Sequence, residues 1–181
     1  MNHPSSLKRI LSSPKCALIF LCCLSFSSMA RDIPVELGDE WVFSNGEEYP
    51  GGKGSLEAGN ADNTLAIAYD FKGGGQYVAA GTFIDASGEL DGAEVTATGP
   101  GGNLGVVLTD NTDQHFIFRL GQLEDSEKTF DLPLDKPSSS YGGADDKTLH
   151  FPIKGIRLII EKNPSQLEGT VTVSKIVLHT K

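Results

Sequence analysis

The histidines are the first side chains to consider for catalytic chemistry. Three of them follow residue 30, namely His115, His150 and His179, and their spacing does not suggest a metal site. The sequence also has no H-E-x-x-H zinc motif, no G-x-S-x-G nucleophile motif and no phosphate-binding loop. These observations favour a protein that binds a ligand over one that catalyses a reaction.

Paired carboxylates are another route to catalysis, because glycosidases use two carboxyl groups about 5–9 Å apart. The most concentrated pairs are Glu47 with Glu48 and Asp145 with Asp146. Neighbouring residues on a strand point to opposite faces, and both pairs fall in loop-like sequence, which is typical of solvated acidic loops. A small all-β glycan hydrolase or lyase is therefore the third of three functional alternatives.

A different set of residues suits the binding of a sugar. His115, Arg119 and Arg157 alternate with apolar residues, so they would lie opposite the core and share one face if their two strands are neighbours. Arginine offers five fixed donors to hydroxyl groups or to a uronic-acid carboxylate. Tyr141 could flank that face with an aromatic ring for the C–H side of a sugar. We predict a carbohydrate-binding site formed by His115, Arg119, Tyr141 and Arg157, with no catalytic residue and with metal ligands unassigned.

Each of these residues also has a purely structural interpretation. Arg119 and Arg157 could form ion pairs with nearby acidic residues on the surface. Tyr141 could cover one end of the core. Trp41, the only tryptophan, is typical of a core position near the first strand.

The strands that would carry these residues are marked by alternating apolar positions. In residues 65–71, 115–120 and 156–161 every second residue is large and apolar, which is typical of half-buried strands. Phe116, Phe118, Leu158 and Ile160 are assigned to the core. Further strands are predicted at residues 40–43, 77–84, 94–98, 105–109, 128–132 and 170–179.

Glycine clusters between these strands indicate turns. They lie at residues 51–52, 73–75, 101–102 and 142–143. The best helical candidate, residues 121–128, is short, and residues 137–143 are interpreted as a long loop over one sheet. The pattern predicts an all-β fold, a single two-sheet antiparallel β-sandwich of residues 31–181 with its termini on adjacent strands.

Residues 1–30 have the pattern of a secretory signal peptide. Lys8, Arg9 and Lys15 precede an apolar stretch at residues 16–26, and small residues follow at 28–30. This stretch is shorter than the roughly 20 residues that a membrane span needs. We predict that the leader is cleaved rather than kept as an anchor, which gives a secreted or periplasmic protein without a transmembrane span. All 3 cysteines lie in this segment, so the mature chain would contain no disulfide.

The charge balance limits the classes of partner. The chain has 24 acidic and 15 basic residues and a formal net charge of −9. Nucleic acids and anionic lipid headgroups require clustered lysine and arginine, so neither is expected as a partner.

Five segments of the chain form an ordered set of turn and core patterns. They begin with Trp41-Val42-Phe43 and the run NGEEYPGGKGSL at residues 45–56, and they continue at residues 69–78, 108–111, 141–153 and 169–178. In this order they resemble the carbohydrate-binding modules attached to bacterial glycoside hydrolases, which are jelly-roll, galactose-binding-like β-sandwich domains. The resemblance implies a jelly-roll fold over nearly all of the chain after the leader, and it implies a function only by analogy.

Two positions depart from that pattern. Many such domains have an aspartate in the last strand, often linked to a structural calcium, and this chain has Ser174 there. The difference weakens the expectation of calcium, although backbone carbonyls and other carboxylates can also bind this ion. Tyr141 stands at a loop position that often holds tryptophan, and it offers less area for stacking on a sugar.

The resulting hypothesis is a secreted, non-catalytic carbohydrate-binding module that recognises a polysaccharide or glycan beside a separate carbohydrate-active enzyme. The alternative is a structural or protein-interaction β-sandwich of an exported assembly. A protein-interaction surface should be a continuous apolar patch of more than a few hundred Å². A sugar site should instead be a groove lined by Tyr141, His115 and the arginines.

Overall fold

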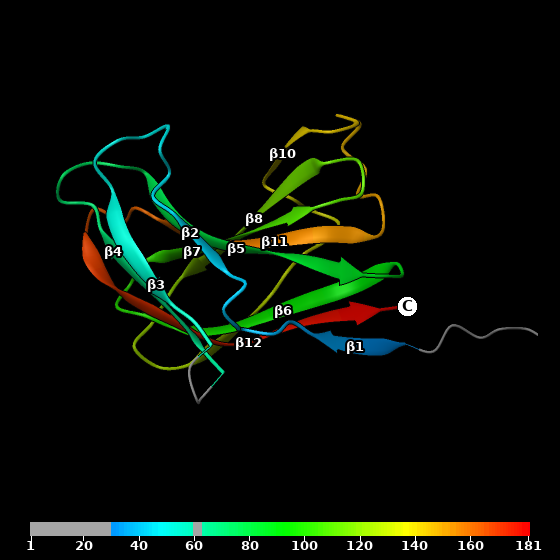
Figure 1. Ribbon diagram of the computed structural model, residues 1–181, viewed down its shortest axis with the longest axis horizontal. Coiled ribbons are helices and arrows are strands. Elements are labelled where there is room, and N and C mark those ends of the chain that lie inside the picture. Colours follow the sequence, from blue (N-terminus) through cyan, green and yellow to red (C-terminus); the bar gives the residue numbers. More distant parts are fainter. Residues whose placement is uncertain (1–29, 60–62) are drawn as a thin grey trace, which may run out of the picture.

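Two antiparallel sheets of six strands each lie face to face in the computed structural model, which describes residues 30–59 and 63–181 (Figure 1). We name each sheet after one of its central strands. The β12 sheet has the order β3 (Lys53–Glu57), β4 (Leu65–Asp70), β12 (Glu168–Thr180), β6 (Leu90–Thr98) and β9 (Lys128–Asp131), and β1 (Arg31–Pro34) also pairs with β12. The β11 sheet has the order β10 (Ser139–Gly142), β8 (Gln114–Gln122), β7 (Asn103–Thr109), β11 (Ile153–Glu161), β5 (Tyr77–Ala86) and β2 (Val42–Ser44).

The last strand, β12, pairs with the first strand, β1, so the two ends of the described chain lie side by side. Its first half pairs with β4, from Glu168 opposite Asp70 to Val173 opposite Leu65. Its second half pairs with β1, which Figure 1 shows beside it. The predicted placement of the termini on adjacent strands is therefore confirmed, and so is the all-β two-sheet sandwich.

The core fills the space between the sheets. Phe116 and Phe118 of β8 and Leu158 and Ile160 of β11 are all buried in it, as the alternating pattern predicts. Trp41 is also buried, and its indole N–H donates a hydrogen bond of 2.9 Å to the carbonyl oxygen of Glu36. The structural interpretation of Trp41 is therefore correct.

One expectation about local structure is wrong, the loop at residues 137–143, and the structure decides two open points. Residues 121–128 form no helix, because Gly121 and Gln122 continue β8 as it pairs with β7. Residues 137–143 are not simply a loop, because β10 lies within them and pairs with β8. The strands β8 and β11 are not neighbours, since β7 lies between them.

Besides β10, two further strands were not predicted, β1 and β3. Both are short and lie largely exposed, so their sequences lack the apolar alternation that marks a half-buried strand. No helix among the described residues is long and apolar enough to cross a membrane. The predicted leader lies outside the described residues except for Ala30.

Candidate binding site

The outer face of the β11 sheet carries the residues that the sequence singled out. Although β7 separates β8 from β11, it keeps them in register, because Val107 pairs with Ile117 on one side and with Arg157 on the other. The side chains of His115, Arg119 and Arg157 therefore lie on the same face of the sheet. The three side chains share one face although β8 and β11 do not pair, which was the condition under which the sequence predicted it.

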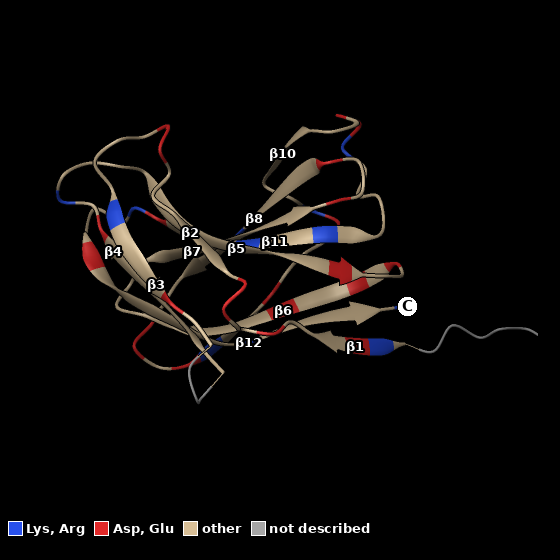
Figure 2. Cartoon of the chain, in the orientation of Figure 1, with Lys and Arg blue, Asp and Glu red and all other residues tan. Residues whose placement is uncertain are grey.

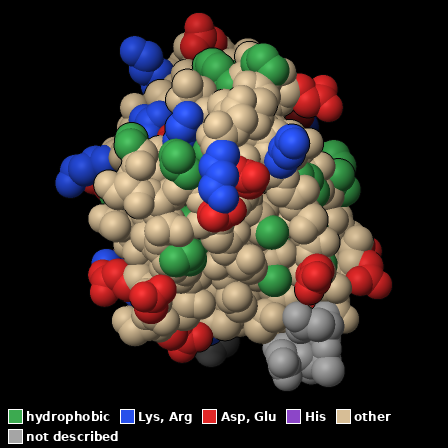
Figure 3. Space-filling model, turned by 90° about the vertical axis from the view of Figure 1, so that its left-hand side faces the viewer, with side chains coloured by type: hydrophobic (Ala, Val, Ile, Leu, Met, Phe, Trp, Pro, Cys, Tyr) green, Lys and Arg blue, Asp and Glu red, His purple; other side chains and the backbone are tan. Residues whose placement is uncertain are grey.

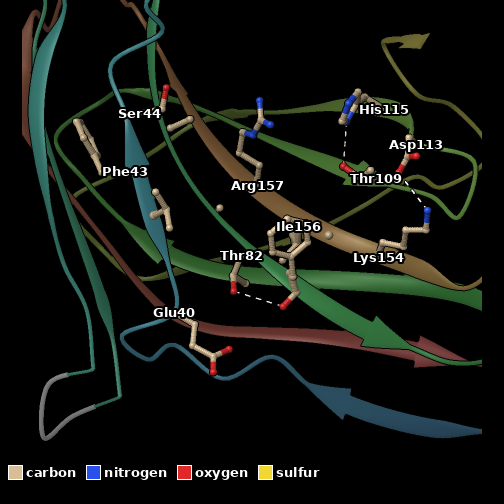
Figure 4. Close-up of a pocket in the computed structure, with 15 residues that line it drawn as sticks. Glu40, Phe43, Ser44, Thr82, Thr109, Asp113, His115, Lys154, Ile156 and Arg157 are labelled. Atoms are coloured by element: carbon tan, nitrogen blue, oxygen red, sulfur yellow. Dashed lines mark hydrogen bonds and ion pairs between the residues drawn. The ribbon is translucent and has the colours of Figure 1, made fainter. Parts of the chain in front are cut away.

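His115 and Tyr141 form an aromatic pair at one end of this face. They are register partners on β8 and β10, with ring centroids 4.8 Å apart and planes inclined by 33°. The hydroxyl group of Thr109 lies 2.9 Å from Nδ1 of His115 and fixes the orientation of the imidazole (Figure 4). Tyr141 remains 48% exposed, so its ring is accessible to a ligand.

The imidazole of His115 is neutral at neutral pH. Burial lowers the pKa of His115 below the usual value of 6.5, and the positive charge of Arg157 lowers this pKa further. A neutral imidazole can donate one hydrogen bond and accept another. It can therefore contact the hydroxyl groups of a ligand as well as stack with Tyr141.

Arg157 lies next to this aromatic pair. Its side chain leans over Gly81 of β5, where an added Cβ atom would come within 3.2 Å of Cγ of Arg157. Figure 4 shows the guanidinium group between Ser44 and His115. Within the described residues, the guanidinium group makes no hydrogen bond and no ion pair. Its five donors are therefore available to a ligand.

Arg119 lies on the same face, but its charge is already neutralised. Its Nε lies 2.9 Å and 3.2 Å from the two carboxylate oxygens of Glu161. Arg119 also does not line the pocket that contains Arg157 and His115. The structural interpretation of both arginines was a surface ion pair. Arg119 forms such a pair, and Arg157 forms none with the described residues.

A pocket of about 580 Å³ opens on this face between β2 and β8. His115 and Arg157 line it, together with Glu40 and the ion pair of Asp113 and Lys154, whose charged atoms are 3.1 Å apart (Figure 4). Its rim includes two highly exposed apolar side chains, Phe83 at 91% and Val42 at 71% exposure. Phe83 was placed in a strand by the sequence but not recognised as a surface residue.

The opposite end of the face is organised around Tyr77. Its hydroxyl group donates a hydrogen bond to Oε1 of Glu48, and its ring packs edge-on against Tyr49 at a centroid distance of 6.2 Å. Burial and the bond to Glu48 raise the pKa of Tyr77 to about 12. The same hydrogen bond, with a smaller contribution from Arg157, lowers the pKa of Glu48. Glu48 thus lies in an exposed acidic loop, as expected, and its hydrogen bond with Tyr77 orients the carboxylate.

Glycines hold the loop that carries Glu48 and Tyr49. A side chain at Gly51 would collide with the carbonyl oxygen of Gly73, and one at Gly75 would come within 2.6 Å of the backbone of Gly52. The N–H of Gly75 also donates to the carbonyl oxygen of Pro50 over 3.1 Å. The two glycine clusters therefore pack backbone against backbone, and this contact could not be read from their turn-like composition.

Asp110 anchors the turn between β7 and β8, next to the aromatic pair. It is fully buried, and one of its oxygens accepts hydrogen bonds from the N–H and hydroxyl groups of Thr112 and the N–H of Gln114 at 2.8–3.0 Å. The other oxygen accepts from the N–H of His150 at 3.1 Å. Burial alone would raise the pKa of Asp110, but these hydrogen bonds outweigh burial and lower the pKa below 3.8.

Ser174 stands where the resemblance places an aspartate that is often linked to a structural calcium. The hydroxyl group of Ser174 donates to Oε1 of Glu127 over 2.7 Å. Calcium takes 6–8 oxygen ligands, of which carboxylates are the main ones. Among the described residues, no group of three or more histidine, cysteine, aspartate and glutamate side chains is arranged to hold a metal ion.

Charged side chains are spread over both sheets. Figure 2 shows acidic residues at many loops and strand ends. Figure 3 views one end of the sandwich, where basic side chains lie mainly in the upper half and hydrophobic ones appear as small separate patches. That end therefore shows no continuous apolar surface of the kind expected for a protein-interaction module.

No protein-family model and no curated protein matches the sequence. Solved structures do match in fold, beginning with the family 11 carbohydrate-binding module of the cellulosomal cellulase Lic26A-Cel5E of Clostridium thermocellum. The TM-score is 0.59 at 15% identity, over 83% of this chain and 95% of that one. The chain has the β-sandwich fold of carbohydrate-binding modules.

Two further structures share this carbohydrate-binding-module-like fold. A family 29 carbohydrate-binding module matches with a TM-score of 0.50 and 12% identity, over 84% of this chain and 87% of that one. The agarase AgWH50C matches with a TM-score of 0.55 and 13% identity, over 83% of this chain but only 24% of its own length. At these identities the likeness is one of fold.

Proposed function

We propose that this chain is a secreted, non-catalytic carbohydrate-binding module that binds a glycan on the outer face of the β11 sheet. The observation that carries the proposal is Arg157, whose guanidinium group makes no hydrogen bond and no ion pair with the described residues and lies in a pocket beside the His115–Tyr141 pair. The donors of this guanidinium group are therefore available to the hydroxyl groups of a ligand. The shared fold with carbohydrate-binding modules supports this function.

The arrangement provides both kinds of contact that a sugar requires. The exposed ring of Tyr141 offers a flat surface to the C–H side of a pyranose. Arg157 offers planar donors, and the neutral imidazole of His115 offers one donor and one acceptor to hydroxyl groups. Such an open site with few anchoring residues should bind in the micromolar to millimolar range.

Two carboxylates line the pocket, and an ion pair engages one of them. Those that line it are Glu40 and Asp113, and Asp113 is bound to Lys154. The chain would then act outside the cytoplasm beside a separate carbohydrate-active enzyme, as its leader-like first 30 residues suggest.

A second candidate function is the binding of a protein partner on the same face. Phe83 and Val42 favour it, because exposed apolar side chains of this size are common in interfaces. Polysaccharides and protein partners can be distinguished because only a glycan site should respond to soluble polysaccharides in the absence of any other protein.

Thermal unfolding in the presence of soluble polysaccharides tests the proposal. A ligand that binds only the folded state adds about 2.7 kcal/mol of stability at a hundredfold excess over Kd. We expect the melting temperature to rise with one class of glycan and to stay constant with the others. A well-folded protein whose melting temperature responds to none of them would contradict glycan binding and favour a protein partner.

A further inference from the structure

The aromatic pair and Phe83 lie at opposite ends of one row of residues across the β11 sheet. Tyr141 pairs with His115, His115 with Thr109, Thr109 with Gly155, and Gly155 with Phe83. Because neighbouring strands are about 4.8 Å apart, Tyr141 and Phe83 are separated by roughly 20 Å. A single sugar ring cannot contact both aromatic side chains, whereas a polysaccharide chain can.

The residues between the two ends leave room for such a chain. Thr109 and Gly155 carry small side chains or none, and Gly81 is adjacent in the next row, beside Arg157. Arg157 therefore lies near the middle of a shallow path that begins at Tyr141 and ends at Phe83. All residues of the path except Tyr141 line the pocket of about 580 Å³.

Phe83 is unusual for an aromatic residue in the interior of a sheet. Its 91% exposure follows from its neighbours, because Gly155 has no side chain beside it and β2 pairs with β5 only at Ala79, Ala80 and Gly81. A phenyl ring left in water gains nothing for folding. Its position is explained if a ligand covers it.

A second pocket of about 560 Å³ begins on the other side of Phe83. It shares Glu40, Thr82 and Phe83 with the first pocket, so the two pockets adjoin at the Phe83 side chain. Its walls come from β5 and from β1 with the segment that follows it, at the flank of the sandwich rather than on the outer face. The apolar residues that line it are Ile33, Pro34, Val35, Ile84, Ala86 and Leu178.

The charges along this path select against an anionic ligand. Four carboxylates and no lysine or arginine line the second pocket, and they belong to Glu36, Asp39, Glu40 and Asp85. In the first pocket Lys154 is bound to Asp113, which leaves Arg157 as the cation without a partner among the described lining residues. Carboxylates accept hydrogen bonds from hydroxyl groups but repel uronic-acid or sulfate groups.

We infer that the glycan site extends over Phe83 into the second pocket and that its ligand is an uncharged polysaccharide chain. Phe83 is the stacking surface at the junction of the two pockets, and the carboxylates of the second pocket bind hydroxyl groups of the sugar units beyond it. This inference rests on the proposed function, and it adds a second binding subsite and the class of ligand.

Native affinity electrophoresis tests the class of ligand directly. The full-length protein is run in gels that contain mixed-linkage β-glucan, glucomannan, agarose or, as the anionic probe, polygalacturonate. We expect at least one uncharged polymer to retard the protein and polygalacturonate to leave its mobility unchanged. Retardation by polygalacturonate alone would overturn the inference and leave glycan binding itself intact.

Substitutions of Phe83 test the second subsite of the protein, and their effect is measured with the polymer that binds. Phe83→Ala and Phe83→Leu should weaken binding about tenfold, since an aromatic contact contributes up to about 1.5 kcal/mol. Phe83→Trp keeps an aromatic face and should bind at least as well as the unaltered chain. Because the side chain is exposed, all three variants should melt within a few degrees of the parent, which shows that each has folded.

Oligosaccharides of increasing length, cut from the same polymer, separate the two pockets. The affinity of the unaltered protein should rise with length until the chain reaches Phe83 and the second pocket, and Phe83→Ala should remove the last part of this rise. Equal affinities of the parent and of Phe83→Ala at every length would overturn the inference while the proposed function stands. A protein that none of the four polymers retards would contradict both.

Discussion

The rings of His115 and Tyr141 lie 4.8 Å apart between β8 and β10, and this contact joins the edge of the sheet to its candidate site. The strand β10 has only four residues and one neighbour, so its side-chain contacts matter for its position. Tyr141 nevertheless remains 48% exposed. One residue thus both holds the edge strand and presents a ring to a ligand.

Replacement of Tyr141 should therefore affect stability and binding together. Tyr141→Ala should lower the free energy of unfolding by about 0.5–1.5 kcal/mol, the usual contribution of an aromatic pair, and should weaken glycan binding about tenfold. Tyr141→Phe keeps the ring and should change both quantities little. Urea denaturation and affinity electrophoresis measure the two effects. If Tyr141→Ala bound as tightly as the parent, Tyr141 would be a structural residue only.

The lowered pKa of His115 predicts a loss of stability in mild acid. The folded state binds this proton less readily than the unfolded state does, so stability is complete above about pH 6.5 and falls as the pH falls toward the lower pKa of the folded protein. His115→Gln removes the titrating group. The difference in unfolding free energy between His115→Gln and the parent should change over this interval. A difference that is constant between about pH 5 and pH 8 would contradict a lowered pKa.

Asp110 should be the most sensitive residue of the turn beside the site. Asp110→Asn places an amide NH₂ group against backbone N–H donors, and it should cost about 2–4 kcal/mol because a buried, charge-assisted network is broken. Asp113→Asn is the matched control in the same turn, since this side chain is 76% exposed and should cost less than about 0.5 kcal/mol. Chemical denaturation near neutral pH compares the two. Similar losses in both variants would contradict this role of Asp110.

Because the side chain of Arg157 lies close to Gly81, a substitution of Gly81 should weaken glycan binding with little change in stability. In Gly81→Ala the new Cβ would press on Cγ of Arg157 at 3.2 Å and displace the guanidinium group. The φ angle of Gly81 is not in the left-handed region, so alanine should gain stability from the lower entropy of the unfolded chain. The new Cβ would also lie 3.2 Å from the backbone carbonyl oxygen of Ile156, which offsets this gain, so stability should change by less than about 1 kcal/mol. We expect several-fold weaker glycan binding in calorimetry. Unchanged affinity would show that the position of Arg157 over Gly81 is not needed.

Most of the fold follows from local patterns in the sequence. The period of two in residues 115–120 and 156–161 correctly identified both the strands and the residues that face the core, because side-chain alternation is a property of the strand itself. The insertion of β7 between these strands was not predictable, since strand order depends on pairing between distant segments. His115 and Arg157 nonetheless share a face. The alternation within each strand decides which side chains point away from the core, and this does not depend on the order of the strands.

The residues that the sequence did not reveal owe their roles to contacts between distant segments. Glu48 lies in an exposed acidic loop, as expected, but its hydrogen bond with Tyr77, 29 residues away, was not predictable from the sequence. Phe83 belongs to a predicted strand, but its exposure depends on Gly155 and on the end of β2. In the sequence Arg119 and Arg157 looked equivalent. The structure distinguishes them, because Arg119 forms an ion pair with Glu161, 42 residues away. A weak signal for Phe83 was available, since Tyr77, Ala79, Gly81 and Phe83 alternate on one side of β5.

The most direct test of the account compares Arg157→Ala with Arg119→Ala in isothermal titration with the polysaccharide that retards the parent protein. Both substitutions remove one arginine from the same face of the sheet, but only Arg157 lacks a partner among the described residues. We expect at least a tenfold loss of affinity for Arg157→Ala and less than about a threefold loss for Arg119→Ala, with both variants melting near the parent temperature. Unchanged affinity in Arg157→Ala would show that the pocket around Arg157 does not bind the glycan.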